Sequence, residues 1–87
     1  MATSTLGGNL RSAREGRGWS RETLARKSST SVPAIARTEL YGTEPRLSTL
    51  WKWALALEVE PTELLPDVQV FNLAAEIDAA LDDKAAS

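Results

Sequence analysis

Apolar residues recur at helical spacing in short blocks along this chain, and turn-forming residues end each block. Leu6, Leu10 and Ala13 stand at i, i+4 and i+7, and a later block runs from Leu47 to Leu57 with the same period. Valine, isoleucine and threonine do not alternate over any useful length, so the pattern favours helices over strands. With 87 residues, the chain can bury one modest core. We therefore predict an all-α protein.

Turn and cap residues set the expected ends of the helices. Gly18 suits a left-handed helix end, Ser20 and Ser31 suit N-caps, and Pro33 fits the first turn of the helix that Ser31 opens. Trp19 stands just before the Ser20 cap, where it can contact the fourth residue of the helix. The predicted helices cover approximately residues 5–17, 21–27, 32–40, 47–57, 61–65 and 70–81. Within them, we expect Ile35, Thr38 and Trp53 to face inward.

The chain contains neither cysteine nor histidine. Disulfides and thiolate metal ligands are therefore excluded, and the commonest zinc ligand and the usual general base are missing. Nucleophilic catalysis by serine–histidine or cysteine–histidine pairs is excluded for the same reason. We predict a protein that is not an enzyme and that has no metal, no cofactor and no small-molecule substrate.

Targeting signals are not recognisable in the sequence. No stretch approaches the roughly 20 apolar residues that a membrane-spanning helix needs. The segment Met1–Thr5 lacks the charged and apolar regions of a secretory signal. We therefore expect a cytoplasmic protein without a membrane partner.

Charge is distributed unevenly along the chain. Residues 1–53 carry nine basic and four acidic side chains, whereas residues 54–87 carry one basic and eight acidic side chains. Such asymmetry favours nucleic-acid contact at the basic end, although ordinary surface charge that happens to segregate would look the same. The overall net charge of −2 conceals this division.

A run of short motifs between residues 10 and 65 resembles one known family. The motifs follow one another without a gap, and they are Leu10 and Arg14, Trp19–Ala25, Ser31–Glu39, Pro45–Leu50, Trp53–Val59 and Glu63–Leu65. Their order and spacing are similar to those of the lambdoid-repressor-like helix-turn-helix family, which contains phage repressors and Cro proteins (the XRE type). The resemblance implies a five-helix lambda-repressor-like DNA-binding domain in residues 1–65. An additional acidic C-terminal helix and tail would occupy residues 66–87.

In this family the third helix enters the major groove of double-stranded DNA, which is about 12 Å wide. The matching outward positions here, expected to contact bases, are Val32, Pro33, Ala36 and Arg37. Arg37 is the one polar reader among them, and its guanidinium suits guanine O6 and N7. A solvent-facing arginine is the alternative interpretation. Because no glutamine or similar reader stands early in this helix, specificity would also depend on DNA shape.

The resemblance assigns supporting roles to five further residues. Arg21, Ser31 and Arg46 match positions that commonly contact the DNA backbone, and Arg14 and Glu39 match an ion pair that fixes the angle of the recognition helix. The chain departs from the family pattern at Thr38, where an aliphatic residue is usual, and at Tyr41, where glycine is common.

The C-terminal segment carries an apolar stripe with acidic residues around it. This stripe either folds back on the domain or pairs with its copy in a homodimer, and the candidate interface residues are Val70, Phe71, Ala74, Ile77 and Leu81. The acidic side chains would repel phosphate, so we expect the segment to lie away from the DNA. Trp51 is expected to be partly exposed, and a core or interface role is favoured over stacking on single-stranded bases.

The sequence as a whole predicts a sequence-specific transcriptional regulator, a repressor or a Cro-like protein, that acts by occupying an operator. The alternative is an antitoxin-like or adaptor module that binds another protein and binds DNA weakly. The apolar residues of the recognition helix and the acidic C-terminal segment would suit this alternative.

Overall fold

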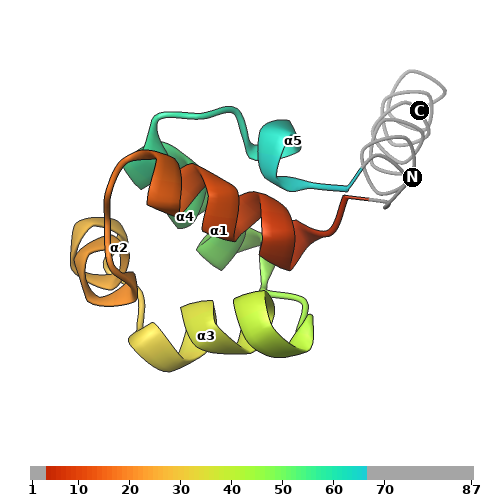
Figure 1. Cartoon of the computed structure of the whole chain (residues 1–87), viewed down its shortest axis with the longest axis horizontal. Coiled ribbons are helices and arrows are strands. Elements are labelled where there is room, and N and C mark those ends of the chain that lie inside the picture. Colours follow the sequence, from red (N-terminus) through yellow and green to blue (C-terminus); the bar gives the residue numbers. More distant parts are fainter. Residues whose placement is uncertain (1–3, 67–87) are drawn as a thin grey trace, which may run out of the picture.

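The computed structural model describes residues 4–66, which form five α-helices and no strand (Figure 1). The helices are α1 (Leu6–Gly16), α2 (Arg21–Ser28), α3 (Val32–Tyr41), α4 (Leu47–Leu57) and α5 (Pro61–Leu64). The predicted all-α class is confirmed, and the helix ends lie within one or two residues of those expected. The predicted helix over residues 70–81 lies outside the described residues. The candidate interface residues on it also lie outside: Val70, Phe71, Ala74, Ile77 and Leu81.

Hydroxyl side chains begin the first three helices, as the sequence predicts for the second and third. Thr5, Ser20 and Ser31 are the N-caps of α1, α2 and α3, and each hydroxyl oxygen accepts a hydrogen bond from the amide three residues later. These bonds satisfy amides that have no partner within the helix. Gly18 and Gly42 follow α1 and α3 with φ of 71° and 70°, a conformation that glycine adopts without steric cost. Short helices therefore start and stop at sequence-defined positions.

The core receives side chains from all five helices. Its largest fully buried members are Trp53, Leu10, Leu24, Ile35, Leu57 and Leu64. Ile35 and Trp53 thus face inward, as predicted. Asn9 joins the two ends of the domain, because its side-chain amide donates to the carbonyl oxygens of Leu64 and Leu65 at 3.1 and 3.3 Å.

The crossing of α1 and α3 is close. A Cβ atom on Gly7 would lie 2.3 Å from the carbonyl oxygen of Thr38, so the two helices approach at a point where only glycine fits. The Thr38 side chain is itself buried, and its hydroxyl donates to the carbonyl oxygen of Thr43 at 2.8 Å. Threonine at this core position is therefore satisfied by a hydrogen bond, which also ties the segment after α3 back to the helix.

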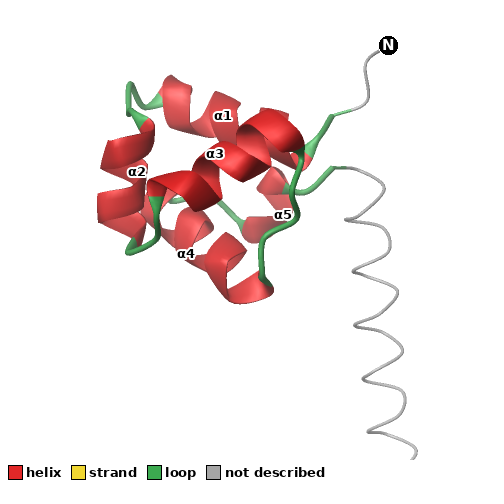
Figure 2. Ribbon diagram, turned by 90° about the horizontal axis from the view of Figure 1, so that it is seen from below, coloured by secondary structure: helices red, strands yellow, loops and turns green. Residues whose placement is uncertain are grey.

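Helix α3 lies on an outer face of the domain. It runs along the lower edge in Figure 1 and crosses in front of the other helices when the molecule is viewed from below (Figure 2). Across residues 4–66, none of the helices has the length and apolar character that a bilayer crossing requires. The predicted cytoplasmic location stays a prediction.

Candidate nucleic-acid interface

Helices α2 and α3 are joined by a tight turn, and hydrogen bonds from α2 and α4 hold this turn in place. Ser29 ends α2 in the left-handed conformation, with φ of 56°. The buried Ser28 hydroxyl donates to the carbonyl oxygen of Leu24 at 2.6 Å and lies 2.7 Å from the Thr30 hydroxyl. Trp53 of α4 donates from its indole Nε1 to the Thr30 hydroxyl at 3.0 Å. The turn between the two helices is therefore held to the core.

The exposed flank of α3 carries the residues that the sequence assigns to base contact. Pro33 and Arg37 are exposed, whereas Val32 and Ala36 are half-buried and Val32 packs partly against the core. Within the described part of the chain, the Arg37 side chain makes no hydrogen bond or ion pair, so its guanidinium is available to a ligand. The structure therefore places Pro33 and Arg37 at the surface and gives Val32 a share in packing.

A buried carboxylate anchors the C-terminal part of α3. Glu39 is fully buried, and its two carboxylate oxygens accept hydrogen bonds of 2.9 Å from Nε and Nη2 of Arg14. Arg14 also donates from Nη1 to the carbonyl oxygen of Trp19 at 2.7 Å, which fixes the segment that leads into α2. The hydrogen bond to Glu39 raises the pKa of Arg14 above its ordinary value. This two-pronged ion pair sets the position of α3 relative to α1.

Arg21 adds a second cation to the same carboxylate. Its Nε donates to Glu39 Oε1 at 3.1 Å, while 30% of its side chain remains exposed. The Glu39 carboxylate is thus shared by two guanidinium groups, those of Arg14 and Arg21. The sequence assigned Arg21 to the DNA backbone alone and missed this contact, because residues 18 positions apart share no local spacing that would pair them.

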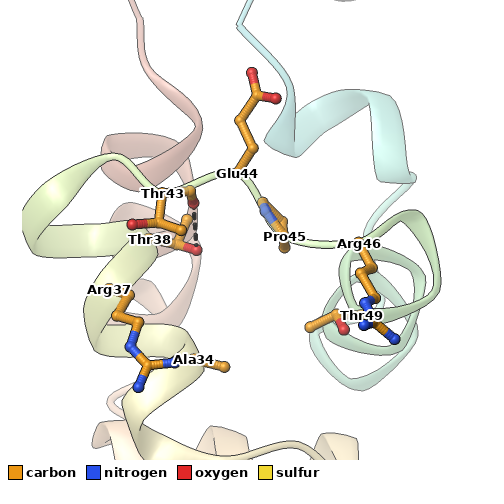
Figure 3. A pocket seen from close by; sticks show the side chains of 8 residues that line it. All are labelled: Ala34, Arg37, Thr38, Thr43, Glu44, Pro45, Arg46 and Thr49. Carbon is orange, nitrogen blue, oxygen red and sulfur yellow. Dashed lines mark hydrogen bonds between the residues drawn. The ribbon is translucent and has the colours of Figure 1, made fainter.

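An open groove separates α3 from the beginning of α4 (Figure 3). It encloses about 250 Å³, and its lining residues are Ala34, Arg37, Thr38, Thr43, Glu44, Pro45, Arg46 and Thr49. The Thr38–Thr43 hydrogen bond crosses one wall (Figure 3). Arg46 is exposed at the N-cap of α4, and within residues 4–66 its side chain makes no ion pair. Two uncommitted guanidinium groups, those of Arg37 and Arg46, thus border this groove.

Other basic side chains of the N-terminal half are engaged elsewhere. Arg17 binds Glu58 at 3.2 Å, and its guanidinium carbon lies 5.3 Å from the centre of the Trp19 ring. The Lys27 amine lies 5.2 Å from the same ring. These cation–π contacts fasten the end of α1 to α2. Arg17 and Lys27 thus serve in contacts within the protein, whereas Arg37 and Arg46 remain exposed beside the groove.

The match to a family model decides the classification. The model described as helix-turn-helix matches residues 10–64, which is more than half of the chain. The chain belongs to the helix-turn-helix family. Within it, the chain is of the lambda repressor and Cro-like type that the sequence resembles. This helix-turn-helix protein is a DNA-binding transcriptional regulator.

Two solved structures are similar to this helix-turn-helix protein. The restriction-modification controller protein C.AhdI from Aeromonas hydrophila is 35% identical, with a TM-score of 0.65 over 69% of this chain and 91% of that chain. A hypothetical transcription factor, NHTF from Neisseria, is 33% identical, with a TM-score of 0.64 over 79% of each chain. Among curated proteins, no match was found. The predicted sixth helix falls beyond residue 64, where the family match ends.

Proposed function

We propose that this DNA-binding regulator recognises a specific operator sequence and represses transcription, or acts in a Cro-like manner, by occupying that operator. Helix α3 enters the major groove, and the bound protein excludes the polymerase from the promoter. Similarity to a restriction-modification controller protein and to a hypothetical transcription factor supports a role in transcription.

The availability of Arg37 is the observation that carries this proposal. Its guanidinium projects from the exposed flank of α3 and has no partner within residues 4–66. The helix that presents it is fixed by the buried Glu39, so the side chain starts from a defined place. A bidentate contact from Arg37 to O6 and N7 of guanine is the most common specific contact of an arginine in the major groove.

Contacts to phosphate would hold α3 in register. Arg21 begins α2 and keeps 30% of its side chain exposed, and Arg46 is exposed at the N-cap of α4. The Ser31 hydroxyl accepts a hydrogen bond from the Ala34 amide at 3.2 Å, which leaves its own hydrogen free to donate to a phosphate oxygen. Such contacts position a protein on DNA without reading the sequence.

The other residues on the exposed flank of α3 can contact bases only through apolar groups. Pro33 and the exposed part of Ala36 can meet thymine methyl groups, but they offer no donor to a base. Much of the specificity would then come from the shape and deformability of the operator. We therefore expect discrimination at one guanine position per bound chain, together with a broader preference for flanking sequence.

Fluorescence anisotropy provides the test. The protein is titrated into a labelled duplex from the region that flanks its own gene, and into a scrambled duplex of the same composition, at low and near-physiological salt. Tight binding to the first duplex, weak binding to the second and a loss of affinity with rising salt are expected. Equal, weak binding to both duplexes would contradict the proposal.

An antitoxin-like or adaptor module remains the second candidate, because α4 presents exposed apolar side chains at Leu47, Trp51 and Leu55. Under this alternative, Arg37→Ala would leave the affinity for a partner protein unchanged, and substitutions at Phe71 or Ile77 would abolish it. Under the regulator proposal, Arg37→Ala weakens discrimination between operators.

A further inference from the structure

Helix α4 carries an uncovered apolar stripe. Leu47, Trp51 and Leu55 stand at i, i+4 and i+8, and they are 63%, 53% and 67% exposed. Positions with this spacing lie on one face of a helix, so the three side chains form a continuous surface about 12 Å long. Contiguous apolar surface of this kind commonly marks a place where another segment docks. We refer to these three residues as the α4 stripe.

The α4 stripe does not belong to the DNA-facing groove. Thr49 lines that groove, and its position on α4 is about 160° around the helix axis from the middle of the stripe. The core residues Leu50, Trp53 and Leu57 occupy the face between them. A segment that covered the stripe would therefore leave α3 and the groove open to DNA.

The sequence after Pro66 has the composition that this surface requires. Residues 67–87 contain five acidic residues and one lysine, and the apolar positions from Val70 to Leu81 recur at helical spacing. Helix α4 itself contains no acidic residue, and Lys52 stands next to Trp51. An acidic amphipathic helix is thus complementary to α4 in both apolar surface and charge.

The point where the described chain ends also favours contact with the same molecule. Pro66 closely follows α5, which packs against α4. Residues 67–69, which connect Pro66 to the start of the apolar positions, can span about 10 Å when extended. A segment tethered this closely has an effective concentration in the millimolar range, so it competes well against a second copy of the chain.

We propose that residues 67–87 of the same chain cover the α4 stripe, with the apolar side of an acidic helix packed on Leu47, Trp51 and Leu55. This inference is independent of the proposed operator binding. It assigns the segment, which lies beyond the residues matched by the family model, to the surface of α4 that faces away from the groove.

Nuclear magnetic resonance of the full chain tests the contact directly. Nuclear Overhauser effects are expected between the ring protons of Trp51 and the methyl groups of Val70, Ile77 or Leu81. In a mixture of labelled and unlabelled protein, an isotope-filtered spectrum should lack these signals, because the contact lies within one molecule. Signals that appear only between chains would assign the stripe to a second copy, and an absence of signals in both spectra would leave it uncovered. Either outcome would overturn the proposal.

A double-mutant cycle gives an independent test that does not depend on assigning the spectrum. Ile77→Ala should lower the urea midpoint of the wild-type chain and have less than half of that effect in a Leu55→Ala background. Leu40→Ala is the matched control, because Leu40 is a leucine of similar exposure, 55%, at the end of α3. The effect of Ile77→Ala should be unchanged in the Leu40→Ala background. Equal effects in all three backgrounds would contradict the contact.

Discussion

At the scale of single residues, Arg37 and Arg46 are expected to contribute differently to DNA binding. Arg37 projects from α3, and Arg46 projects from the start of α4. We predict that Arg37→Ala removes about 1–3 kcal/mol of discrimination at one base pair, because a bidentate contact to guanine is lost. Anisotropy titrations with a set of singly substituted operators would measure this loss.

Arg46→Ala is the comparison for that experiment. Loss of the Arg46 side chain should weaken binding to all duplexes by a similar factor, because a phosphate contact carries no sequence information. Both variants should retain the urea midpoint of the wild type, since neither side chain has a partner within residues 4–66. If Arg37→Ala weakened all operators equally, Arg37 would be a backbone contact and the assignment of base reading would be wrong.

Substitution of Glu39 should lower the free energy of unfolding, whether or not DNA is present. Glu39→Gln leaves the buried Arg14 and the partly buried Arg21 side by side without the carboxylate that they share. We predict a loss of about 3–5 kcal/mol in the free energy of unfolding, as for other ion pairs broken from one side. Urea denaturation measures the loss. Glu22→Gln on the exposed surface of α2 is the control, with an expected change within about 0.5 kcal/mol.

At the scale of helices, sequence patterns predicted most of the architecture. Cap residues and apolar spacing are local signals, so the starts of α2 and α3 after Ser20 and Ser31 were predicted correctly, whereas Thr5, expected inside the first helix, is its N-cap. Packing between helices is a non-local property. The hydrogen bond from Trp53 to Thr30 and the close approach at Gly7 were therefore not predicted from the sequence.

The candidate site shows the same division. Family resemblance paired Arg14 with Glu39, and the structure brings these side chains together. The resemblance assigned both Val32 and Arg37 to base contact, whereas in the structure Val32 also packs partly against the core. The contact between Arg21 and Glu39 arises only when α2 and α3 meet in space. Position in a motif thus predicted which helix carries the exposed Arg37, but not how each side chain divides its contacts.

Gly7 offers a test of how tightly α1 and α3 pack. In Gly7→Ala, the new methyl group would meet the Thr38 carbonyl, and the helices must separate. We predict a loss of about 1–3 kcal/mol in the free energy of unfolding, typical of an overpacked core. Gly16→Ala is a matched control near the other end of α1, because its Cβ would meet nothing within 4 Å.

The control should leave stability unchanged or raise it by up to about 1 kcal/mol, since alanine favours the helix more than glycine does. Thermal or urea unfolding of the two variants beside the wild type would separate steric conflict from helix propensity. Equal effects of the two substitutions would mean that α1 can shift away from α3 without cost.

At the scale of the whole molecule, the separation of charge determines how the protein approaches DNA. Residues 1–53 have a net charge of +5, and residues 54–87 have a net charge of −7. A net charge of −2 gives no overall attraction to a polyanion. We predict that the uneven distribution orients the molecule, with the face of α3 toward phosphate and the acidic sequence of residues 54–87 away from it.

This arrangement predicts a modest dependence of binding on salt, set by the contacts of α3 and its neighbours rather than by total charge. If Arg21 and Arg46 each neutralise one phosphate, log K should fall with log salt with a slope of about −2 per chain. A palindromic duplex with two half-sites about 34 Å apart should bind two chains and give a slope of about −4. Titrations of single-site and palindromic duplexes over a range of salt concentrations would measure both slopes, with the stoichiometry taken from the end points. The Arg46→Ala variant should reduce the slope by about one unit per chain. Identical slopes for the two duplexes, with one chain bound to each, would show that the protein reads its operator as a monomer.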